Sequence, residues 1–105
     1  NNYANGLLGL QRFGEAKALL RTTIPVALRV LGESDTLKLT MRKIFAMALY
    51  EDPAATRSDL REATTTLEEI ERTARRMLGG AHPTTAAIER NLRASRDALY
   101  ARGLP

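Results

Sequence analysis

The fold is decided by the stretch "SDLREATTTLEEIERTARRMLGG", which runs from Ser58 to Gly80. Its apolar residues recur every three or four positions, the spacing that places side chains on one face of an α-helix. These residues are Leu60, Ala63, Leu67, Ile70, Ala74 and Met77. Ser58 belongs to the residue types that cap helix N-termini, and Gly79 to the type that ends helices. We therefore predict one amphipathic helix here, capped by Ser58 and stopped by Gly79.

The same spacing extends over three other stretches of the chain. Apolar residues recur over 12–32, where Pro25 predicts a kink or a short break because proline lacks the amide N–H of a helix interior. A second helix is predicted over 35–50, and a third begins at Pro83. No stretch alternates between apolar and polar residues as a half-buried strand does. The sequence therefore predicts an all-α protein.

Length and composition restrict the class of protein further. The chain has 105 residues, which suffices for one small core, and 44% of them are hydrophobic. It has no cysteine, which excludes disulfides and fits a reducing compartment, so the cytoplasm is favoured. No apolar run reaches the roughly 20 residues that cross a bilayer. The formal charge is +4, but the arginines are dispersed and aromatic residues are few, which argues against nucleic-acid binding.

Catalytic and metal-binding chemistry has few candidate side chains. His82 is the one histidine, and it lies in the glycine- and proline-containing stretch "LGGAHPTT" over 78–85. Metal sites need several converging ligands, and nucleophilic catalysis needs a nucleophile beside a base. The sequence therefore predicts no enzyme, no metal and no cofactor. We expect His82 to lie at a joint between two helices, where it either meets the free amides of the second helix or packs on the link.

An internal repeat organises the helices. Seven residues recur 47 positions later in the same order. Phe13, Glu15, Ala16, Leu20, Ala27, Leu31 and Gly32 correspond to Leu60, Glu62, Ala63, Leu67, Ala74, Leu78 and Gly79. The helices that precede these two segments align with a separation of 42 positions instead of 47, so that Ala4 corresponds to Ala46. The difference places a five-residue insertion near 50–59. Tandem helix pairs predict a solenoid, in which buried alanines allow neighbouring helices to approach closely.

These blocks resemble the tetratricopeptide repeat, in the longer variant found in kinesin light chains. The matching residues are Asn1, Asn2, Tyr3 and Ala4, then Arg12, Phe13, Glu15 and Ala16, then Val30, Leu31 and Gly32, and later Leu78, Gly79, His82, Pro83, Asn91 and Leu92. The sequence departs from the pattern at Ile44, where asparagine is expected, and at Arg93, where a small residue is expected.

The resemblance implies a right-handed α-solenoid of antiparallel helix pairs, about two and a half repeats and five helices long. The chain would be a single domain over 1–105 and the C-terminal part of a longer array. Repeat one would cover 1–32, repeat two 33–80, and a terminal capping helix 81–105.

The resemblance also implies binding of a peptide or partner protein in a concave groove lined by the first helix of each pair. The candidate groove residues are Asn2, Lys43, Met47, Arg90 and Asn91. The two asparagines fall where the family clamps a ligand backbone, and the two cations favour an acidic partner. A structural spacer or oligomerisation segment, which self-associates and has no groove ligand, stays open as the alternative.

Overall fold

The computed structural model describes residues 13–31 and 36–102, apart from the side chains of Leu28 and Leu31, and this part contains four α-helices. They are α2 (Phe13–Leu31), α3 (Thr36–Tyr50), α4 (Arg57–Leu78) and α5 (Pro83–Ala101). Because no strand occurs among these residues, the all-α prediction is confirmed. The helix expected at the start of the chain, with Asn2 and Ala4, lies outside the described residues. None of the four helices is long and apolar enough to span a membrane.

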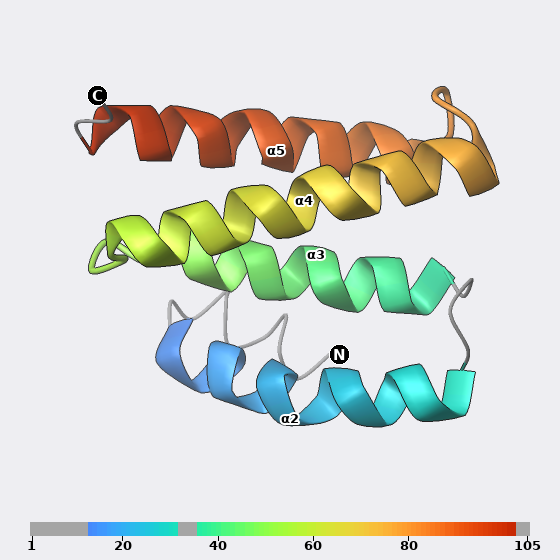
Figure 1. The fold of residues 1–105 in the computed structure, drawn as a ribbon, viewed down its shortest axis with the longest axis horizontal. Helices are drawn as coiled ribbons and strands as arrows, with labels where there is room; N and C mark the ends of the chain where they lie inside the picture. The colour runs from blue at the N-terminus through green and yellow to red at the C-terminus, as the bar shows by residue number, and fades with distance from the viewer. Residues whose placement is uncertain (1–12, 32–35, 103–105) are drawn as a thin grey trace.

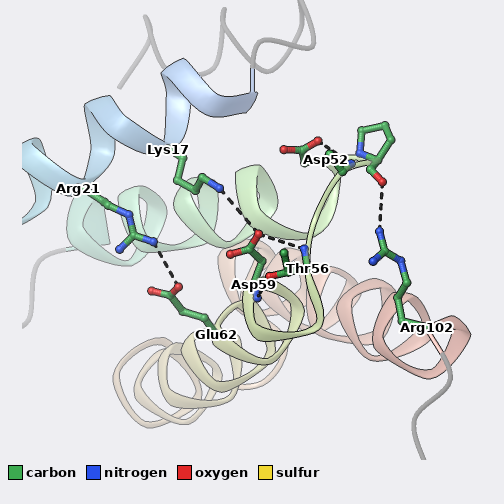
Figure 2. Close-up of polar contacts among 9 residues, drawn as sticks. Lys17, Arg21, Asp52, Thr56, Asp59, Glu62 and Arg102 are labelled. Carbon is green, nitrogen blue, oxygen red and sulfur yellow. Dashed lines mark hydrogen bonds and ion pairs between the residues drawn. The ribbon is translucent and has the colours of Figure 1, made fainter.

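The helices form an antiparallel stack in chain order (Figure 1). Each helix packs against the next one, and α3 also packs against α5. In addition α2 reaches α4 through the ion pairs Lys17–Asp59 and Arg21–Glu62 (Figure 2). Because α3 has neighbours on three sides, it is the most enclosed helix, and one continuous core runs through the stack.

The apolar stripe of α4 is buried as the spacing predicts. Leu60, Ala63, Leu67, Ile70 and Ala74 are buried, and Met77 is half-buried. The buried alanines also meet the expectation of close helix packing. Ala16 of α2 contacts Ala48 of α3, and neither side chain is exposed to solvent. A larger side chain at such a position would have to push two helix backbones apart.

The N-terminus of α4 corrects the prediction that Ser58 is the cap. The cap is Thr56, whose hydroxyl accepts a hydrogen bond from the Asp59 amide, while the Asp59 carboxylate accepts one from the Thr56 amide, each 3.1 Å long (Figure 2). A cap at Ser58 would instead face Arg61 three residues later, and arginine cannot accept a hydrogen bond from the cap amide. The other end agrees with the prediction, because α4 stops at Gly79, whose φ is +89°.

The short break considered at Pro25 does not occur, because α2 is one helix from Phe13 to Leu31. Proline removes the hydrogen bond to the carbonyl of Arg21, four residues earlier. Pro25 and Arg21 are both exposed, so water can replace that bond. The hydroxyls of Thr22 and Thr23 also donate to the Leu19 carbonyl, at 2.9 and 2.7 Å.

The segment between α3 and α4, residues 51–56, falls within the predicted insertion and contacts the end of α5. Asp52 accepts a hydrogen bond from the Ala54 amide, and Arg102 donates to the Pro53 carbonyl at 3.1 Å (Figure 2). Ala55 is buried against Leu60 and Leu99 in a small second cluster. This segment therefore fastens the C-terminal end of α5 to the start of α4.

His82 occupies the joint that the sequence predicts. It is the N-cap of α5, and its Nδ1 atom accepts a hydrogen bond from the Thr84 amide at 3.1 Å. Pro83 follows at the first helical position, where its missing N–H costs no intrahelical bond. The expectation that His82 meets the free amides of the final helix is confirmed.

We expect His82→Ala to lower the free energy of unfolding by about 1 kcal/mol, the usual cost of losing a side-chain N-cap. His82→Asn should retain most of the stability, because asparagine accepts the same amide hydrogen bond. Urea unfolding followed by circular dichroism would measure both variants. Equal losses for alanine and asparagine would contradict a capping role.

Candidate interaction surface

The structure places four of the five predicted groove residues on two neighbouring helices. Lys43 and Met47 lie one turn apart on α3 and are half-buried. On α5, Arg90 is exposed and Asn91 is half-buried. Asn2 lies outside the described residues, so its predicted role stays a prediction.

α3 has one side that its neighbours leave partly open. The residues on this side are Thr40, Lys43, Met47 and Tyr50, which recur at intervals of three and four and are all half-buried. Most of the remaining α3 side chains are buried against the adjacent helices. A ligand on this side of α3 would therefore contact this line of four side chains.

A hydrogen bond brings Asn91 to the same line. The Asn91 Nδ2 atom donates to the Tyr50 hydroxyl at 2.7 Å, which joins α5 to the end of α3. We call the surface formed by Thr40, Lys43, Met47, Tyr50, Arg90 and Asn91 the α3/α5 face. Arg90 lies at its edge, because adjacent residues of a helix point about 100° apart. The sequence predicts Lys43, Met47, Arg90 and Asn91 but gives no sign of Tyr50 beyond its helical spacing from Met47.

This contact changes what Asn91 can do. One N–H of its amide is already engaged by Tyr50, while its Oδ1 atom has no hydrogen bond to any part of the chain that the structure describes. Asn91 can therefore accept a hydrogen bond from a ligand amide without releasing Tyr50. A clamp that uses both the oxygen and the nitrogen of this amide would have to use the second N–H of Nδ2, because the first is engaged by Tyr50.

The α3/α5 face is cationic. Neither Lys43 nor Arg90 has a carboxylate partner among residues 13–31 and 36–102. The α3 segment contains no aspartate or glutamate, and Glu89 of α5 is bonded to Arg75 of α4 instead. These two cations have no carboxylate partner among the residues that the structure describes, so they attract anionic groups to this face, while Glu51 places one negative charge near Tyr50 at its end.

Burial raises the pKa of the Tyr50 hydroxyl above its ordinary value, the hydrogen bond from Asn91 acts in the opposite direction, and the charge of Glu51 adds to the increase. Burial also raises the pKa of Glu51, the residue that follows α3. Each shift favours the protonated form in the folded chain. The tyrosine therefore stays neutral to a higher pH in the folded protein than in the unfolded one.

A pH dependence of stability follows from Tyr50. Its contribution is intact below its unfolded pKa of about 10 and is lost as the pH rises from that value through the folded pKa. We expect the decrease in stability above about pH 10 to be smaller in Tyr50→Phe than in the wild type. Urea unfolding at a series of alkaline pH values would measure the difference. Parallel decreases in the two proteins would contradict the prediction.

A cavity of about 310 Å³ lies between α4 and α5, lined by Glu71, Glu89, Leu92, Arg93 and Arg96. Ion pairs cross this interface. Arg75 of α4 binds Glu89 of α5, and Arg96 of α5 binds Glu68 of α4 at 3.0 Å. Most of the charge around the cavity is therefore neutralised locally. The sequence gives no sign of this cavity, because the charged residues around it have the pattern of ordinary exposed helix faces.

Among the residues that the structure describes, no group of three or more histidine, cysteine, aspartate or glutamate side chains is arranged to hold a metal ion. Comparison of the chain with protein-family models, with curated proteins and with solved structures found no match. The resemblance to tetratricopeptide repeats therefore rests on the sequence blocks alone.

Proposed function

We propose that this protein is a non-catalytic interaction module whose α3/α5 face binds an acidic segment of a partner protein or peptide. The observation that carries the proposal is the joining of α3 and α5 through Tyr50 and Asn91, on a face whose two cations have no carboxylate partner among the described residues and whose α3 segment has no carboxylate. Met47 adds a flexible apolar side chain of the kind that adaptable binding surfaces use.

The packing order supports a helical repeat array as the scaffold for this function. α3 contacts α4, which follows it in the chain, and also α5, which follows α4. In a solenoid of helix pairs, the first helices of successive pairs are neighbours and line one side of the array. We propose that α3 and α5 are such first helices, in a right-handed solenoid of the tetratricopeptide type.

Charge reversal tests the proposed binding face. Lys43→Glu combined with Arg90→Glu should weaken partner capture in a pull-down at least tenfold at low salt, because both substitutions replace attraction by repulsion. Arg61→Glu is the matched control, since Arg61 is an exposed arginine on α4, away from the α3/α5 face. Loss of the same partner in the control, or its retention in the double variant, would refute the proposal.

A second candidate is a spacer that associates through its apolar surface and leaves the α3/α5 face empty. It is favoured by Val26 and Val30 of α2, which expose 48% and 75% of their surface. Contiguous exposed apolar side chains mark interaction sites. Normal partner capture by the double variant, together with altered self-association on replacing these valines, would favour the spacer.

A further inference from the structure

The fold neutralises the acidic side chains of α4 and leaves most of its arginines unpaired. The segment contains five acidic residues and five arginines, so it has no net charge by itself. Four of its carboxylates pair with cations of other helices and one pairs within α4. These pairs are Lys17–Asp59, Arg21–Glu62, Arg42–Glu69, Arg96–Glu68 and, within α4, Arg75–Glu71. Because the neighbouring helices supply these cations, the positive charge of α4 is left in excess.

The four remaining arginines of α4 lie in one line. Arg57, Arg61, Arg72 and Arg76 are all exposed, and none has a carboxylate partner among residues 13–31 and 36–102. They are spaced by four, eleven and four positions, and each interval is close to a whole number of turns of an α-helix. They therefore share the side of α4 that points away from the core. We call these four residues the arginine stripe.

The arginine stripe consists of two pairs separated by a gap. The members of each pair lie about one turn apart, and the rise per residue places Arg61 and Arg72 about 16 Å apart along the helix axis. Two acidic residues in this gap, Glu68 and Glu69, are each bonded to an arginine of a neighbouring helix. The gap therefore adds no net negative charge to the stripe.

Helix stability explains only part of the arginine stripe. Arg76 lies in the last turn of α4, where a cation interacts favourably with the helix dipole. Arg57 is the first residue of α4, where the same dipole is unfavourable for a cation. A bound anion would remove this disadvantage, because it would neutralise Arg57 and would itself be favoured at a helix N-terminus.

The surroundings of the stripe restrict the kind of anion. On α4, which the structure describes in full, no large apolar side chain is exposed. Protein interfaces have an apolar core, and helices that bind membrane surfaces insert apolar side chains. The α4 segment also has no aromatic residue on which the bases of a single strand could stack. Arginine alone suits phosphate, since its planar group can donate two parallel hydrogen bonds.

We propose that the arginine stripe binds the phosphate backbone of duplex DNA without reading its sequence. The major groove of DNA is about 12 Å wide, so a helix laid across it can place one arginine pair on each flanking backbone. The major groove of duplex RNA is deep and narrow and does not present two backbones in this way. The dispersal of arginines along the sequence argued against nucleic-acid binding, but the fold gathers four of them on one side of one helix.

Fluorescence anisotropy of a fluorescein-labelled DNA duplex of arbitrary sequence, about two helical turns long, would measure binding to the 105-residue chain. Each arginine–phosphate contact contributes about −0.9 to the slope of log association constant against log salt concentration. Four contacts therefore predict a slope of about −3.6. Raising the salt from about 50 to about 200 mM should weaken binding roughly 10²-fold.

Glutamine substitutions would locate the contacts. Arg57→Gln combined with Arg61→Gln should reduce the slope to about −1.8, and Arg72→Gln combined with Arg76→Gln should have the same effect. Glutamine removes the charge but retains a polar side chain, and all four positions are exposed, so the fold should be retained. Circular dichroism would verify this for each variant.

Lys43→Gln combined with Arg90→Gln is the matched control, because it removes the same net charge from the α3/α5 face and should leave the slope near −3.6. Absence of DNA binding at about 50 mM salt, or an equal change of slope in this control, would overturn the proposal. So would equal or stronger competition by duplex RNA, by polyglutamate of the same charge or by anionic vesicles. Partner capture at the α3/α5 face uses other helices, so each proposal can fail while the other stands.

Discussion

Leu67→Ala is expected to lower the free energy of unfolding by about 3–4 kcal/mol. Leu67 is fully buried in the middle of α4, in the core that includes Leu20 of α2, Leu49 of α3 and Ile88 of α5. Alanine removes three carbon atoms and leaves a cavity that helices on several sides would have to move to fill. A domain of this size is stable by only about 5–15 kcal/mol, so the loss is a large part of the total.

Chemical denaturation followed by far-ultraviolet circular dichroism would measure this loss. Tyr100→Ala is a suitable control, because Tyr100 is highly exposed and its removal should change stability by no more than about 0.5 kcal/mol. A small effect of Leu67→Ala, similar to that of the control, would mean that α4 does not pack at the centre of the stack.

Ala46→Leu is expected to destabilise the protein by about 1–3 kcal/mol, although it adds apolar surface. Ala46 is completely buried on α3, which packs against α2, α4 and α5. Leucine needs room that the contacts between these helices do not provide, so side chains or backbones must shift. For a domain of 60–100 residues, each 1 kcal/mol lowers the melting temperature by about 4–8 °C.

Thermal unfolding of Ala46→Leu and Ala94→Leu would test the claim of close packing. Ala94 is exposed on α5, so the same substitution there has room and should leave the melting temperature nearly unchanged. If Ala46→Leu were as stable as the wild type, α3 would have to lie farther from its neighbours than the structure shows.

The helices themselves could be predicted because their signals are local. Apolar spacing of three and four residues identified the buried stripe of α4, and glycine and proline marked the boundaries near Gly79 and Pro83. The predicted N-cap of α4, Ser58, was wrong by two residues. Thr56 and Ser58 are both residue types that cap helices, and the choice depends on whether the residue three positions later can return a hydrogen bond.

The candidate site could be predicted only in part. Lys43 and Met47 follow from helical spacing and from the resemblance to a repeat family. Tyr50 does not, because its importance comes from a hydrogen bond to Asn91, 41 residues away in the chain. The partners that surface charges find on other helices were equally hidden, since Glu68 of α4 pairs with Arg96 of α5. Such pairings depend on how helices are placed, which no short stretch of sequence encodes.

The sequence by itself determined that this protein is built of helices, where most of them begin and end, and which side of α4 is buried. These properties arise from hydrogen bonds and side-chain spacing within about one turn of each residue. Only the tertiary structure decided that α3 packs against both α4 and α5, and that Val26 and Val30 are left uncovered. A helix with several apolar side chains can bury them against more than one neighbour, and the choice is made by the packing of the whole stack.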